Sequence, residues 1–171
     1  MWATLRILFA GGLCAGLLGS GCAAAASPSG CDQFKWPIAH EQAALAAPPA
    51  GPLAPGAALP ADTGAPLKLV PFAEAKLALA PQRPPKFSPS YAGAFALDAP
   101  AAPAVYKVTL SAGGWIDLVQ DGKFLKAINF SDATGCANAR KSVKFRLAAE
   151  PATLQLTGVG APDVSIIVSP E

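Results

Sequence analysis

The pair Asp121-Gly122 is the feature that most restricts the fold, because it separates two runs rich in β-branched and aromatic residues. An Asp-Gly pair accepts the positive φ angles of a two-residue type I′ turn, and the twist of this turn matches that of its flanking strands. We therefore expect residues 115–120 to pair in antiparallel fashion with residues 123–130. The sequence predicts a β-hairpin at this point of the chain.

An alternation of apolar and polar side chains runs from residue 91 to near the end of the chain. It is clearest where Val143, Phe145 and Leu147 are separated by polar residues. A period of two is typical of strands with one buried face. About seven or eight such strands, separated by Gly, Pro and Asp at roughly ten-residue spacing, predict an all-β fold. We expect an antiparallel β-sandwich of jelly-roll or immunoglobulin-like type over residues 90–171.

Proline divides the chain into two parts, since 15 of the 18 prolines lie between Pro28 and Pro103. We expect residues 27–89 to form a Pro/Ala-rich N-terminal arm. Pro37 suits the first position of a helix, which predicts a short helix over residues 38–47. The apolar side of this helix is expected to pack on the sandwich.

Three further stretches of the arm have a recognisable composition. Residues 66–71 are bounded by prolines and predict a short edge strand, because proline cannot donate to a β-ladder. Residues 75–80 are a second, weaker strand candidate. Residues 81–89, PQRPPKFSP, fit either a passive extended linker or a polyproline recognition segment.

The first 26 residues have the pattern of a secretory signal peptide. Arg6 precedes an apolar stretch over residues 7–18, and alanines at 23–26 suit signal peptidase. A retained transmembrane anchor is the alternative, although so short a stretch spans a bilayer poorly. The run before Cys22 also resembles a lipoprotein processing site, except that Gly19 stands where Leu or a similar residue is usual. We expect a periplasmic or secreted protein, or a membrane-anchored lipoprotein lipidated at Cys22.

Cys31 and Cys136 are the two cysteines beyond this signal. In an exported protein, such a pair is expected to form one disulfide. It would close a loop of roughly 100 residues, for which chain entropy gives a stabilisation of about 4–5 kcal/mol. A redox-active or metal-binding pair is the alternative, but the chain lacks a C-x-x-C motif and holds few other soft or imidazole ligands.

The charge and the rarity of histidine argue against several classes of function. Removal of residues 1–26 takes away Arg6 and no acid, which leaves 12 basic and 11 acidic residues. This balance argues against nucleic acid as a partner. The single histidine, His40, is expected to be exposed on the short helix, and it cannot supply a multi-histidine metal site. We expect no metal, no cofactor, and no transmembrane segment after signal removal.

Trp115 and Asp117 are the candidate ligand-binding residues. Trp115 follows two glycines and lies on the opposite face from Ile116 and Leu118. It is either an exposed platform that stacks on sugar rings or a residue buried beneath the arm or a loop, where Trp36 could cover the same region. Asp117 is expected to point to solvent.

Three sequence pieces carry a resemblance to a known family: CDQFKWPIAHEQAAL, YKVTLSAGGWIDLVQDG and GCANARKSVKFRLAAEPATLQLTG. Together they resemble a family of small exported proteobacterial proteins, most strongly over residues 106–158. Some members are labelled homogentisate 1,2-dioxygenase, which implies a longer cupin with iron held by two histidines and a glutamate. His40 is the only histidine here, so no catalytic residue is transferred. The sandwich region is also similar to accessory β domains of secreted peptidases and carbohydrate enzymes.

These observations favour a non-catalytic, exported β-sandwich of the bacterial envelope that acts as a binding or scaffolding module. Its partner would be an envelope protein or a glycan, bound by the Trp115 face or by the loop around Cys136. The competing hypothesis is an enzyme that uses carboxylates alone, with Asp117, Asp121 and Asp132 in one cleft.

Overall fold

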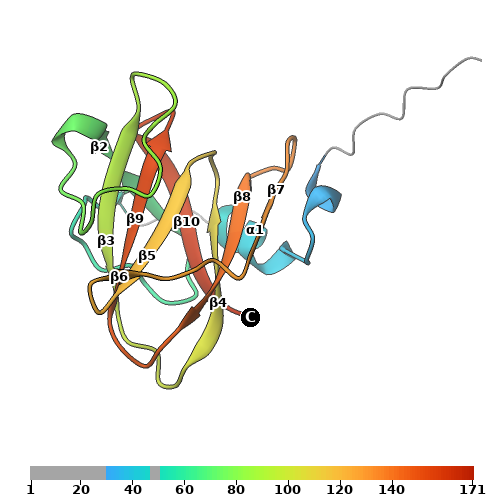
Figure 1. The fold of residues 1–171 in the computed structure, drawn as a ribbon. Helices are drawn as coiled ribbons and strands as arrows, with labels where there is room; N and C mark the ends of the chain where they lie inside the picture. Colours follow the sequence, from blue (N-terminus) through green and yellow to red (C-terminus); the bar gives the residue numbers. More distant parts are fainter. Residues whose placement is uncertain (1–29, 47–50) are drawn as a thin grey trace, which may run out of the picture.

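A computed structural model describes residues 30–46 and 51–171. The predicted signal peptide and Cys22 lie outside these residues. Within them, ten strands form two antiparallel five-stranded sheets that face each other (Figure 1). Sheet A has the order β1 (Ala65–Lys68), β10 (Asp163–Pro170), β4 (Ala104–Leu110), β8 (Lys141–Leu147) and β7 (Asn129–Asp132). Sheet B has the order β2 (Val70–Pro71), β3 (Tyr91–Leu97), β9 (Ala152–Val159), β5 (Trp115–Gln120) and β6 (Lys123–Phe124). The predicted all-β sandwich is confirmed.

The core lies between the sheets and is built from the inward half of each alternating strand. In sheet A, Val108 lies opposite Val143, and both are buried. In sheet B, Leu154 lies between Phe95 and Leu118, and all three are almost inaccessible to solvent. Period-two burial therefore sets the register, because a shift by one residue would move these apolar side chains to the outer faces.

The Asp-Gly turn forms as predicted, but the hairpin is shorter than expected. Asp121 and Gly122 have φ angles of 48° and 65°, as a type I′ turn requires. Only residues 123 and 124 then pair with β5. The chain next crosses to the other sheet, where β7 pairs with β8. The prediction that residues 123–130 form one strand was wrong. Residues 125–128, which include the polar Lys126, connect the two sheets instead of continuing the strand.

The arm supplies one edge strand to each sheet. Residues 65–71 form β1 at the edge of sheet A and, after Leu69, β2 at the edge of sheet B. The single predicted edge strand is therefore two strands. A 3-10 turn, η2 (Phe72–Glu74), follows. The predicted strand at 75–80 does not form, because Leu79 bonds with the side chain of Gln155 rather than with a neighbouring strand.

The first part of the arm covers the outer face of sheet A. It contains η1 (Cys31–Gln33) and α1 (Ala39–Ala46), which lies beside β10 (Figure 1). A second apolar cluster forms there, in which Ile38 and Leu45 pack with Ile167. The predicted helix is confirmed, one residue shorter at each end. Its apolar side packs on the sandwich as expected.

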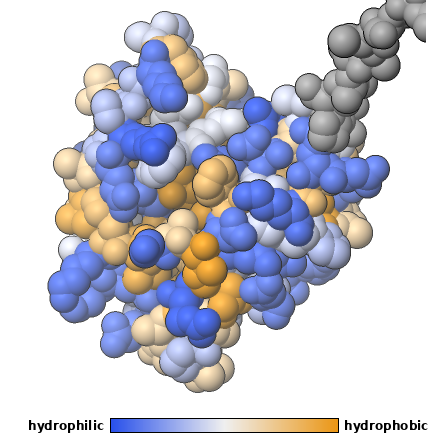
Figure 2. Space-filling model, turned by 45° about the vertical axis from the view of Figure 1, so that its right-hand side comes forward, coloured by the Kyte–Doolittle hydropathy of each residue, from blue (hydrophilic) through white to orange (hydrophobic). Residues whose placement is uncertain are grey.

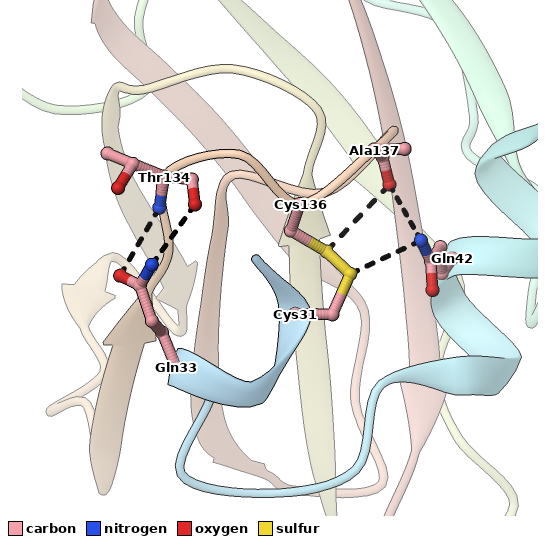
Figure 3. The surroundings of a disulfide bond; sticks show 6 residues. All are labelled: Cys31, Gln33, Gln42, Thr134, Cys136 and Ala137. Atoms are coloured by element: carbon pink, nitrogen blue, oxygen red, sulfur yellow. Dashed lines mark hydrogen bonds between the residues drawn. A yellow bond between two sulfur atoms is a disulfide. The ribbon is translucent and has the colours of Figure 1, made fainter. Parts of the chain in front are cut away.

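The disulfide between Cys31 and Cys136 fixes this part of the arm to the loop between β7 and β8 (Figure 3). Figure 3 also shows Gln33, whose amide donates to the carbonyl of Thr134 (3.1 Å) and accepts from the backbone N–H of Thr134 (3.4 Å). From α1, Gln42 donates to the carbonyl of Ala137 (3.1 Å). The predicted bridge is thus part of a network that joins the arm to the sandwich.

Among the described residues, no helix is long and apolar enough to cross a bilayer.

Candidate functional site

A cleft of about 680 Å³ opens along the free edge of β5, and we call it the β5 cleft. One wall is the proline-rich stretch 83–87, and another is the start of β5 with the two glycines before it. Phe130, Lys141 and Val143 reach it from sheet A. Its volume lies within the usual range for ligand-binding clefts, about 300–1,000 Å³.

The cleft exists because β6 covers only the end of β5. Pairing with β6 is confined to Val119 and Gln120, and the backbone N–H of Leu125 then donates to the carbonyl of Leu118 (2.8 Å). Backbone groups of an antiparallel strand point to alternate sides. Ile116 therefore directs its N–H and C=O toward the same open side as Leu118.

Trp115 is half-buried at the base of the cleft. The Arg83 guanidinium lies over its ring, 4.4 Å from the ring centroid, and the Lys141 ammonium is 5.2 Å from it. The indole Nε1–H donates to Asp117 Oδ1 (2.8 Å). Trp115 is thus a fixed part of the cleft beneath a loop of the arm, with cations over its ring.

Asp117 is 3% exposed, so the expectation that it points to solvent was wrong. The outer face of sheet B is itself covered by the segment around Leu79, which bonds to Gln155 beside Asp117 in the sheet. Burial raises the pKa of the Asp117 carboxyl. Hydrogen bonds with the Trp115 side chain, the Gln82 backbone and the Gln155 side chain, together with the Lys141 charge, offset this only in part. Asp117 Oδ2 has no hydrogen-bond partner among the described residues.

Of the residues that the structure describes, three cations line the cleft and no carboxylate does; the cations are Arg83, Lys86 and Lys141. None of the three belongs to an ion pair within the part of the chain that the structure describes. Lys141 Nζ donates to the carbonyl of Gly114 (2.8 Å). Burial lowers the pKa of the Lys141 ammonium, and the Asp132 charge opposes this effect in part. The Arg83 and Arg140 charges lower the pKa further, and the Asp117 charge raises it. The electrostatic character of the cleft is cationic.

Two exposed phenylalanines border the cleft. Phe87 is 51% exposed and Phe130 is 57% exposed. The ammonium of Lys35 lies 5.0 Å from the Phe130 ring. Figure 2 shows one face of the molecule, on which apolar residues gather near the centre among hydrophilic ones. Exposed aromatic side chains at a cleft are typical of a binding surface.

The predicted site residues separate in the structure. Trp115 and Asp117 lie together, but Asp121 is exposed in its turn and Asp132 lies on β7. None of these three carboxylates lines the cleft. Trp36 does not cover Trp115, because its Nε1–H donates to Ser142 Oγ (3.3 Å) on the outer face of sheet A.

Sequence reasoning missed Arg83, Phe87, Phe130 and Lys141 as cleft residues. The segment PQRPPKFSP held the signal for the first two, since it combines two basic residues and an aromatic one with prolines that prevent strand pairing. Phe130 and Lys141 could not be assigned to the cleft without the crossing of the chain between sheets.

Among the described residues, no group of three His, Cys, Asp or Glu side chains is placed to hold a metal ion. His40 is exposed, as expected, and its Nε2 lies 2.7 Å from Asp62 Oδ1.

Comparison with known proteins found no matching family model, no matching curated protein and no matching solved structure.

Proposed function

We propose that this chain is an exported, non-catalytic β-sandwich of the bacterial envelope that binds a partner in the β5 cleft. The observation that carries the proposal is the combination of exposed aromatic rings and of cations without an ion-pair partner among the described residues, all around one open strand edge. Arg83, Lys86 and Lys141 make no ion pair among the described residues, so a ligand with negative charge would complete their interactions.

The geometry favours a protein partner over a glycan. Sugar rings stack on an aromatic face that is free, whereas Arg83 and Lys141 both lie near the Trp115 ring. The rings that remain accessible, Phe87 and Phe130, lie at the border of the cleft. Aromatic and basic side chains are the residue types enriched in protein–protein interfaces.

The proposed location is supported by the predicted signal peptide and by the disulfide. Bridges such as Cys31–Cys136 form and persist in oxidising compartments, including the periplasm. The mass of the protein isolated from the envelope tests the processing step. A chain that begins after residue 26 indicates ordinary cleavage, and one that begins at a lipid-modified Cys22 indicates an anchored lipoprotein.

The carboxylate-enzyme hypothesis receives no support from the arrangement of its residues. Asp117 is buried against Trp115, whereas Asp121 and Asp132 are solvent-exposed. General acid and base groups must reach one substrate together, and these three do not line a shared cleft.

The test is capture of envelope components by immobilised protein, compared across exposed variants. Components bound by the wild type should be lost with Phe87→Ser/Phe130→Ser, which changes two cleft residues that are already exposed. Ile128→Ser is the matched control, because Ile128 is 52% exposed and does not line the cleft. Components captured equally by all three proteins would contradict the proposal.

A further inference from the structure

The open edge of β5 leaves one residue with unused backbone hydrogen-bonding groups. Residues 114, 116, 118 and 120 present their backbone toward the β6 side. Lys141 Nζ occupies the carbonyl of Gly114, and Leu125 N–H occupies the carbonyl of Leu118. Between them, the N–H and C=O of Ile116 have no partner on this side among the described residues. Ile116 lines the cleft.

When the N–H and C=O of one strand residue are both free, a residue of another strand can exchange two backbone hydrogen bonds with it. From this we propose, on the basis of the function proposed above, that the ligand of the β5 cleft is an extended acidic peptide segment. It adds to the free edge of β5 by exchanging backbone hydrogen bonds with Ile116. Strand addition of this kind derives affinity from the main chain and specificity from alternate side chains.

The two walls of the cleft differ in chemistry. On the inner side of the edge, the Ile116 side chain belongs to the same core cluster as Val143. Phe130 lies beside Val143 in sheet A and also lines the cleft. On the outer side lie Trp115 and the stretch 83–87, with its two cations. Successive side chains of an added strand point to opposite sides. The peptide therefore places apolar side chains against Phe130 and acidic side chains against Arg83 and Lys86.

The charge of the cleft argues for acidic rather than basic peptides. The carboxylates whose charges raise the pKa of Lys141 are Asp132 and Asp117, and neither lines the cleft. A basic segment would meet Arg83, Lys86 and Lys141 in a cleft that no carboxylate of the described residues lines, which is unfavourable.

The experiment uses the mature protein and blocked synthetic hexapeptides, with binding followed by titration calorimetry and by the amide NMR signal of Ile116. The probe alternates Glu and Phe. We expect it to bind about tenfold more tightly than the Lys/Phe peptide and than the same Glu/Phe peptide with N-methylated central amides. The Ile116 amide signal should move with the unmodified peptide alone.

Protein variants locate the contact. Arg83→Gln/Lys86→Gln should weaken binding of the Glu/Phe peptide by about tenfold, since two charge-assisted contacts are lost. Lys123→Gln is the control, because Lys123 is exposed in the Asp-Gly turn and lies outside the cleft. Circular dichroism of each variant confirms that it remains folded.

The outcomes separate this inference from the proposed function. Equal binding of the N-methylated peptide would overturn strand addition, and so would equally tight binding of phenylpropionate, which would indicate a cleft for small acids. Either result would leave intact the loss of envelope capture in Phe87→Ser/Phe130→Ser. Absence of binding by every peptide would overturn the inference alone, whereas capture that is insensitive to Phe87 and Phe130 would overturn the proposed function.

Discussion

The two outer faces of the sandwich are both covered by the N-terminal arm, but by different means. Residues 31–46 cover sheet A with helical turns, an apolar cluster and a disulfide. Residues 72–89 run along sheet B without a helix beyond η2 or a strand. The first cover is fixed by a covalent bond, and the second depends on contacts such as those between Leu79 and Gln155 (3.1 and 3.2 Å).

Each cover buries one carboxylate, and the pKa values of the two carboxylates are shifted in opposite directions. Glu41 in α1 is 0% exposed, and its Oε1 accepts from Lys107 (2.5 Å) and Ser169 (2.6 Å). Burial alone would raise the pKa of Glu41, but these bonds outweigh it and hold the pKa below its ordinary value. Asp117 under the second cover has a raised pKa. One oxygen of each carboxylate, Glu41 Oε2 and Asp117 Oδ2, has no hydrogen-bond partner among the described residues. The contacts of Glu41 outweigh the effect of burial on its pKa, whereas those of Asp117 offset this effect only in part.

The difference between the two covers indicates that one face of the sandwich serves stability and that the other can serve binding. Residues that pair with each other in the interior, such as Glu41 and Lys107, matter for the fold, because removal of one partner leaves the other charge buried and unpaired. Residues that remain incompletely paired, such as Arg83 and Lys141, are available to one. Substitutions on the two faces should therefore separate stability from binding.

Loss of the disulfide should have the largest effect on the sheet A cover. Cys31→Ser/Cys136→Ser removes a bridge between residues 105 apart in sequence, so we expect the free energy of unfolding to fall by about 4 kcal/mol. Urea unfolding of the purified variant measures this. A decrease below about 1 kcal/mol would show that the covalent bond is not what distinguishes this face.

Removal of one partner from the buried ion pair should come next. Lys107→Met leaves Glu41 charged and buried, which we expect to lower the free energy of unfolding by about 3 kcal/mol. Glu41→Gln/Lys107→Met should recover most of this loss. The control is Lys68→Met, since Lys68 and Asp163 form an exposed pair whose loss should cost less than about 1 kcal/mol.

Trp115→Phe tests the sheet B cover. It removes the N–H bonded to Asp117 Oδ1 and leaves that buried carboxylate with less compensation. We expect a loss of about 2 kcal/mol in the free energy of unfolding at neutral pH. The same substitution should cost less in the Asp117→Asn background, where the carboxylate charge is absent; this cost is the difference in the free energy of unfolding between Asp117→Asn and Trp115→Phe/Asp117→Asn. An equal loss in both backgrounds would show that the hydrogen bond to the carboxylate is not the cause.

The two carboxylates should give opposite pH dependences. The lowered pKa of Glu41 means that its stabilisation is present above its ordinary pKa and is lost as the pH falls through the lowered value. The raised pKa of Asp117 means that the native state binds this proton more readily, so its contribution to stability rises as the pH falls from neutral toward 3.8.

Urea midpoints of wild type and single variants between pH 7 and pH 3 measure these slopes. Glu41→Gln should flatten the loss at the acid end, and Asp117→Asn should remove the gain that begins above it. If Asp117→Asn left the profile unchanged, the two faces would not differ in the way their charges are compensated.

The smallest stability effect is expected for Arg83→Gln. Arg83 is exposed and contributes one cation–π contact to Trp115, so its loss should cost about 0.5–1 kcal/mol in the free energy of unfolding. Capture of the partner should nevertheless decrease clearly. If Arg83→Gln lost much stability and no binding, Arg83 would serve the fold and not the binding of a partner.

Much of the fold was predictable because its signals are local. The Asp121-Gly122 turn, the alternation in β8 and the Cys31–Cys136 pair each needed only neighbouring residues or a count of cysteines. The site was less predictable. Alternation placed Asp117 opposite Leu118, but it held no information on which segment would cover the outer face of sheet B. The cleft arises where the chain changes sheets after Phe124, and periodicity does not report such a change.

Residues 65–71 give an edge strand to each sheet, with Leu69 between them. The backbone N–H of Leu69 donates to the carbonyl of Pro162 (2.7 Å). The short connection through Leu69 thus joins the two sheets along this margin. The opposite margin is joined in a similar way, because the chain passes from β6 to β7 there, and the N–H groups of Leu125 and Ile128 donate to the carbonyls of Leu118 and Lys144 (2.8 Å each). The chain therefore ties the two sheets together along both margins, and a ligand of the β5 cleft meets a frame that is held on each side.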